Sequence, residues 1–188
     1  IADGTANAAQ VAAQMLAQAE QDLLAAAILL TPDRLLAEAV QREVWQQLQE
    51  HPQRLLTEKA IAHYGLIAVV DSLESAIELG NAFAPQILHL AVSDPWNALE
   101  KVRQTGTIFL GGTDPHAIGD YLGGLSPHWP GGGTACYGGT IGVEAFLKQA
   151  NLVEYSPAAL RKLSRSLQIL AQAEGRLSSA WALRLRNP

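Results

Sequence analysis

The chain has 188 residues and a formal net charge of −5, with 48% hydrophobic and 16% charged residues. This composition is typical of a folded domain with a sizeable core and excludes a disordered chain. The negative charge and the lack of a long basic block argue against nucleic-acid binding. No apolar run reaches the roughly 18 residues that span a membrane. The single cysteine, Cys136, cannot form a disulfide within the chain, which favours location in the reducing cytoplasm.

The chain opens abruptly with "IADGTAN", in which residues 1–3 are typical of the end of a strand that leads into a helix. We therefore expect a fragment, or a chain whose earlier part is missing. Residues 7–27 are rich in Ala, Gln and Leu, which are good helix formers. Apolar residues recur at every fourth position from Val11 to Leu23, so this segment is predicted to be a helix with one buried face.

Strands and helices alternate over the next eighty residues. Thr31 and Pro32 supply an N-cap and a first helical position for a polar helix that continues to about Glu50. Asp71 and Glu74 resemble a capping box at the start of another helix, and residues 94–106 are predicted to be a capped helix that closes near Gly106. The predicted strands are the short apolar runs at 28–30, 65–70, 87–92 and 107–111.

This alternation predicts an α/β fold with a mostly parallel sheet flanked by helices. Beyond Tyr155 the pattern changes, because Ser156 and Pro157 start a helix that runs to Gly175 with a stripe of four leucines, and a second helical piece follows. We expect an α/β domain over 1–150 and a helical tail over 151–188. The leucine stripe predicts that the tail packs on its own sheet or on a partner chain.

The segment 108–133 contains eight of the sixteen glycines and directly follows the fourth predicted strand. Ligand sites of open parallel sheets gather at the carboxyl ends of the strands, so this segment is a candidate site. It contains no phosphate-binding glycine motif. His116, Asp120 and His128 could be metal ligands, or they could belong to a solvated loop; spacing alone leaves both interpretations open.

The other histidines and two single glutamates are weaker candidates for a functional site. His51 and His63 lie in or near a polar helix and are expected at the surface, whereas His89 lies in an apolar strand, where a buried structural histidine is expected. Glu20 and Glu174 are single carboxylates on helices and are expected to be solvated.

Seven phrases in order resemble the histidinol dehydrogenase family over roughly its C-terminal half: "IADGTAN", "LLTPD", "NAFAP", "TGTIFLGG…P…GDY", "GGTA", "GVEAFLK" and a late "AEG". The resemblance implies a Rossmann-like α/β fold and a homodimer in which a helical tail reaches the partner. It implies zinc as a cofactor and the oxidation of L-histidinol to L-histidine by two NAD molecules. The family's NAD contacts lie mostly in the other half, so no NAD-binding residue is assigned.

The resemblance implies four zinc-ligand positions, two of which keep the family residue. Gln18 is kept in "QAEQ", but Gln21 stands where the family has histidine. Asp120 is kept in "GDY", whereas Ser179 stands in the place of a histidine near the C-terminus. An amide and a hydroxyl would bind zinc far more weakly than two imidazoles.

The implied acid–base pair is replaced as well. The family reads A-P-E-H-L where this chain reads "APQIL", so Gln86 and Ile87 replace a glutamate and a histidine. Neither residue exchanges a proton near pH 7. His89 shares a sheet face with Ile87 but lies about 7 Å farther along the strand, so we do not expect it to substitute.

The family's substrate-binding residues also map here in part. Glu174 is kept. The family's N-H-V-L-P-T-G-G corresponds to "SPHWPGGG", where Pro127 takes the histidine's place without a gap and His128 takes it after a one-residue shift. Three functions stay open: a family member that has lost its zinc-dependent activity, a divergent active zinc- and NAD-dependent dehydrogenase, or a non-catalytic module that binds a small molecule or assembles with a partner.

Overall fold

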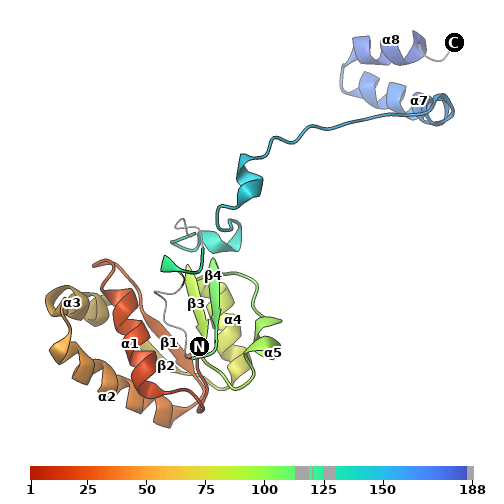
Figure 1. Cartoon of the computed structure of the whole chain (residues 1–188). Helices are drawn as coiled ribbons and strands as arrows, with labels where there is room; N and C mark the ends of the chain where they lie inside the picture. Colours follow the sequence, from red (N-terminus) through yellow and green to blue (C-terminus); the bar gives the residue numbers. More distant parts are fainter. Residues whose placement is uncertain (113–118, 120, 125–129, 186–188) are drawn as a thin grey trace. The chain divides into compact units, whose positions relative to one another are not determined.

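The structure is a computed structural model, and it describes all residues except 113–118, 120, 125–129 and 186–188. The contacts within the chain divide it into two compact units, Ile1–Phe146 and Leu147–Pro188. The first unit is an α/β layer structure and the second is a helical pair (Figure 1).

Two parallel strand pairs form the sheet of the first unit. β1 (Ile28–Thr31) pairs with β2 (Leu66–Val69), and β3 (Ile87–Leu90) pairs with β4 (Thr107–Leu110). Residues 1–3 join the pairs, because the Ala2 N–H donates to the Leu30 carbonyl at 3.1 Å and the Ala91 N–H donates to the Ile1 carbonyl at 2.9 Å.

The spatial order is therefore β2, β1, residues 1–3, β3, β4. Counted along the chain, this is the third, second, first, fourth and fifth strand, which is the order of a Rossmann-like sheet. The predicted α/β fold, the Rossmann-like order and the strand role of residues 1–3 are thereby confirmed.

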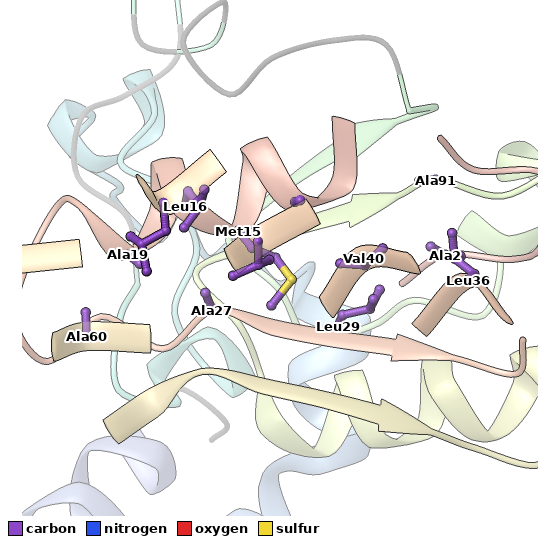
Figure 2. Close-up of a cluster of buried hydrophobic side chains, with 13 residues drawn as sticks. Ala2, Met15, Leu16, Ala19, Ala27, Leu29, Leu36, Val40, Ala60 and Ala91 are labelled. Carbon is purple, nitrogen blue, oxygen red and sulfur yellow. The ribbon is translucent and has the colours of Figure 1, made fainter. Parts of the chain in front are cut away.

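Three helices cover one face of the sheet: α1 (Ala8–Ala19), α2 (Arg34–Glu50) and α3 (Arg54–Tyr64). Their apolar side chains pack on β1 and on the central residues Ala2 and Ala91 to form one core cluster (Figure 2). Met15 and Ala19, predicted on the buried face of the first helix, are in this cluster. Leu23 is 51% exposed, because α1 ends at Ala19 and Leu23 follows it in an irregular segment.

A second cluster covers the opposite face, where α4 (Leu73–Phe83) and α5 (Pro95–Leu99) pack. Leu88 and Leu90 of β3 point into this cluster, together with Ile1. Because side chains alternate along a strand, Ile87 and His89 point to the other face, which is the face that α1 covers. The two residues are half-buried there.

The second unit consists of α7 (Pro157–Ala173), α8 (Leu177–Leu185) and the segment that precedes them. Ser156 caps α7 as predicted, through the Ala159 N–H. Three leucines of the predicted stripe remain exposed, with exposed fractions of 43%, 38% and 60% for Leu163, Leu167 and Leu170. Within the described residues, no helix combines the length and the apolar character that crossing a membrane requires.

The caps of two helices differ from the prediction. Asp33, not Thr31, caps α2 by accepting the Leu36 N–H, while Thr31 accepts the Asp33 N–H. Ser72, not Asp71, caps α4 through the Ser75 N–H. In both helices the N-cap is the residue directly before the first helical residue. Its extended backbone points the side chain at the N–H groups of the first turn.

Two helices end earlier than predicted. α1 ends at Ala19, and the Asp22 carboxylate then accepts the Leu24 N–H, a local turn that replaces helical bonding. α5 ends at Leu99, and the Asn81 side chain holds the residues that follow. Asn81 donates to the Lys101 carbonyl and accepts the Arg103 N–H, so these groups are not available to a longer helix.

Candidate functional site

The candidate site was predicted at the carboxyl edge of the sheet. Polar side chains at this edge accept hydrogen bonds from backbone N–H groups of the same chain. Asp3 follows the central strand, and its carboxylate accepts the Ser93 N–H at 2.7 Å and the Thr5 N–H at 3.0 Å. Partial burial alone would raise the pKa of Asp3, but these hydrogen bonds outweigh it and hold the pKa below its usual range. The Asp3 carboxylate thus ties the central strand to the loop after β3.

Four helices begin at this edge, and a side chain of the chain itself caps each of them. The caps are Asn7, Asp33, Ser72 and Asp94. A Cβ on Gly4 would collide with the Asp33 carboxylate, so a negative charge lies where a Rossmann sheet usually receives phosphate. The geometry of this edge therefore argues against a nucleotide phosphate site in the described part of the chain.

The segment that contains Gln18 and Gln21, two of the implied zinc-ligand positions, lies at the opposite, amino edge of the sheet. α1 leaves the carboxyl end of the central strand and runs back across the sheet, so its last residue, Ala19, lies near Ala27 and away from Ala2 and Ala91 (Figure 2). Gln18 is in the last turn of α1. Gln21 follows the helix with an exposed side chain, and its N–H donates to the Gln18 carbonyl at 3.3 Å.

The predicted acid–base positions reach the same edge. Gln86 directly precedes β3 and is exposed, and its carbonyl accepts the Thr107 N–H at 3.0 Å. Ile87 is the first residue of β3 and points to the face that α1 covers. The structure therefore brings the segments of Gln18 and Ile87 to one edge and one face of the sheet.

The end of the glycine-rich segment comes to this edge as well. A Cβ on Gly106 would lie 2.6 Å from the Gln86 carbonyl oxygen and 2.8 Å from Cδ of Pro130. Only glycine fits there without displacing Pro130. Gly112, by contrast, lies beside Ala91 at the carboxyl edge.

His89 was not expected to substitute for a histidine at position 87. Its ring is stacked on Phe109, with ring centroids 4.7 Å apart and planes at 10°. His89 is partly buried, as expected of a structural histidine, and it lies two residues farther along β3 than Ile87.

The donor atoms that the structure describes do not suit zinc. Nε2 of Gln18 is shielded from solvent and has no hydrogen-bond partner among the described residues. An amide oxygen is a weak ligand compared with imidazole or thiolate, and Gln21 would add only a second amide. The described residues contain no group of three or more His, Cys, Asp or Glu side chains that could hold a metal ion.

The remaining predicted residues fall outside this site or outside the description. His116, Asp120 and His128 lie outside the described residues. In the second unit, Glu174 ends α7 and is exposed, with its carboxylate 3.3 Å from Nε of Arg176, and Ser179 is exposed on α8.

One histidine was misjudged from the sequence. His51 was expected at the surface, but its side chain is only 14% exposed, and its Nε2 lies 3.5 Å from Oε2 of Glu20. Its position between the end of one helix and a proline was the available signal, since such a residue sits in a turn between two helices. His63 is exposed as expected, and Glu20 is partly so.

A cavity of about 340 Å³ lies elsewhere, between α2, the end of α3 and β2. Trp45, Gln41 and Leu66 are among its lining residues. None of the predicted site residues that the structure describes lines it, and we assign no site to it.

Comparison with known proteins gives one family. A family model described as histidinol dehydrogenase matches residues 1–187. Histidinol dehydrogenases of Thermosynechococcus vestitus and of a Synechococcus species are 54% and 55% identical to this chain over 99% and 100% of its length. The crystal structure of histidinol dehydrogenase from Elizabethkingia anophelis matches 98% of the chain with a TM-score of 0.91 and 29% identity. The chain spans 43% of each of the two relatives and 42% of the crystallised chain.

Proposed function

Because the chain belongs to the histidinol dehydrogenase family, we propose that it forms the C-terminal half of a histidinol-dehydrogenase-like protein in which the zinc-dependent oxidation of histidinol is impaired or lost. The observation that carries this proposal is a set of replacements at positions where the chemistry needs histidine or glutamate: Gln21, Gln86, Ile87 and Ser179.

The geometry at the amino edge supports this reading. Gln86 and Ile87 stand at the start of β3, and neither side chain can accept or deliver a proton near pH 7. His89, the titratable residue two positions farther along β3, is stacked on Phe109. General acid–base catalysis contributes about 10²- to 10⁴-fold to rates, so the replacements remove a large part of what an active copy would need.

The test measures zinc and turnover on the longest natural form of the protein, with the Thermosynechococcus vestitus enzyme as a matched control. We expect less than about one-tenth of a zinc ion per subunit by mass spectrometry, and histidinol-dependent NAD reduction at least about 10³-fold below that of the control. About one zinc per subunit together with turnover near the control's would overturn the proposal.

The second candidate is a divergent active enzyme. Its support is Nε2 of Gln18, which is buried without a hydrogen-bond partner among the described residues, together with Asp120, His128 and Glu174 in the sequence. In that case zinc would be present, and Asp120→Ala would remove both zinc and turnover.

A third candidate is a non-catalytic module that binds a small molecule or assembles with a partner. Titration with histidinol and with imidazole separates these roles, since a binding module gives saturable heat or chemical-shift changes and an assembly module gives none.

We also propose that the chain assembles as a homodimer through its helical tail. The support is the exposed leucine stripe of α7, since apolar patches of this kind are usually covered by protein. Light scattering at micromolar concentration should give twice the subunit mass, and a monomeric mass would contradict the proposal.

A further inference from the structure

The junction between α1, α2 and α3 contains a partly buried histidine that the proposed chemistry does not use. His51 is the residue at which α2 ends, and Nδ1 of its ring accepts the Gln53 N–H at 3.2 Å. Because Nδ1 accepts this N–H, it carries no proton of its own, and the ring proton is on Nε2. Nε2 faces the carboxylate of Glu20 at 3.5 Å.

The two sides of this contact differ in rigidity. On one side, Leu48 and Thr57 are fully buried, and the Thr57 hydroxyl donates to the Gln53 carbonyl at 3.1 Å, so the turn that carries His51 is well anchored. On the other side, Glu20 is the C-cap that directly follows α1, and its side chain is 42% exposed. The last turn of a helix frays unless other groups hold it.

We propose that His51 is a positioning residue, which through Glu20 holds the segment Gln18–Gln21 against the amino edge of the sheet. Gln18 lies in the turn that Glu20 ends, and the Glu20 N–H donates to the Leu16 carbonyl at 3.0 Å. A side-chain contact that fixes Glu20 therefore also fixes the backbone from which Gln18 and Gln21 project. The relevance of this segment to a ligand rests on the proposed function, but its positioning by His51 does not.

Two amide substitutions separate the contacts of Nδ1 from the contact of Nε2. Nδ1 lies 3.2 Å from the Gln53 nitrogen and 3.4 Å from the Thr57 hydroxyl oxygen, and Nε2 contacts Glu20. In His51→Asn, the amide oxygen can replace Nδ1 as the acceptor for the Gln53 N–H, but the side chain is too short to reach Glu20. In His51→Gln, the amide nitrogen reaches as far as Nε2 and can donate to Glu20, while the Nδ1 acceptor is lost. Glu20→Ala removes the carboxylate alone.

The experiment is hydrogen exchange of backbone amides, with ¹⁵N spectra of the Gln18 and Gln21 side-chain amides, on the full chain. We expect His51→Asn and Glu20→Ala each to speed exchange at residues 19–22 by about tenfold relative to exchange in the α2 interior and to shift the Gln18 amide signals. His51→Gln should keep exchange at 19–22 within about twofold of the parent and speed exchange at residues 53–57 instead.

The double variant His51→Asn/Glu20→Ala should exchange no faster at 19–22 than either single variant. If His51→Asn leaves residues 19–22 within twofold of the parent, or if both His51 variants loosen both segments alike, the positioning role is overturned. A finding of zinc and histidinol turnover would instead overturn the proposed loss of activity and leave the exchange result unchanged.

Discussion

The two edges of the sheet use their polar groups in different ways. At the carboxyl edge, Asp3, Asp33, Ser72 and Asp94 are all bonded to backbone N–H groups of this chain. At the amino edge, Gln18 has a shielded nitrogen without a partner among the described residues, and Gln86 is exposed.

In open α/β sheets the carboxyl edge usually binds the ligand. Here the hydrogen-bonding capacity of that edge is used to hold loops and helix ends, whereas Gln18, Gln86 and Ile87 lie at the other edge. An edge of a sheet is thus better judged by which of its polar groups still lack partners than by strand direction alone. Three predictions test the contrast, in order of decreasing effect.

The largest effect is expected at the amine of Ile1, in a polypeptide prepared to begin at that residue. In the polypeptide that starts at Ile1, burial lowers the pKa of this amine from 8.0 to about 6, and the amine donates to the His89 carbonyl at 2.9 Å. The unfolded chain binds the proton more tightly, so the free energy of unfolding should rise between pH 6 and 8, by about 3 kcal/mol.

Urea denaturation at pH 5.5, 7 and 8.5 measures this rise. A version extended by several residues before Ile1 is the control, because an amide N–H keeps the hydrogen bond without a charge. An equal rise with pH in both versions would show that other groups are responsible.

The next effect concerns Gly106, which lets Pro130 and the Gln86 carbonyl approach at the amino edge. Gly106→Ala should lower the free energy of unfolding by about 2 kcal/mol, because its methyl group overlaps backbone and a proline ring. Gly139→Ala is the matched control, since a Cβ there meets nothing within 4 Å, and it should stay within about 0.5 kcal/mol. If both variants lower the free energy of unfolding equally, the close contacts at Gly106 do not account for the loss of stability.

The smallest effect is expected at the carboxyl edge. Asp3→Ala should cost about 1 kcal/mol at pH 7, because the Ser93 and Thr5 N–H groups lose their acceptor but remain near solvent. The folded-state pKa of Asp3 is lowered, so its contribution should be present above the unfolded pKa of about 3.9 and fade as the pH falls through the folded value.

Thermal unfolding at pH 7 and pH 3 checks the Asp3 prediction. Asp71→Asn is the control, because Asp71 is exposed and has no hydrogen bond to the described residues. A loss for Asp3→Ala that is as large at pH 3 as at pH 7 would exclude the carboxylate as its source.

The sequence was sufficient for the order of the strands and of most helices, because short apolar runs and amphipathic segments are local patterns, but it did not predict α3. It misplaced the caps of α2 and α4, since Thr31 and Asp33, or Asp71 and Ser72, differ only in where the backbone turns. The length of α5 was overestimated because Asn81, twenty residues earlier, binds the backbone that follows the helix.

The contacts at the amino edge depend on pairings that no local pattern reveals. The placement of Pro130 against Gly106 joins residues 24 positions apart, and the contact between Glu20 and His51 joins two helix ends. The position of Gln18 at this edge could have been inferred from the sequence, because a helix that follows a strand of a parallel sheet runs back to the opposite edge.

The central strand has a consequence for folding order. The two strand pairs are joined only by residues 1–3 among the described residues, so the middle strand is made before the strands on both of its sides. Ala2 can pair with Leu30 early, but its pairing with Ala91 must wait until about ninety further residues have been made. A ribosome-bound chain that stops short of β3 would therefore expose the inner edge of this strand, and loop-closure entropy slows that late pairing.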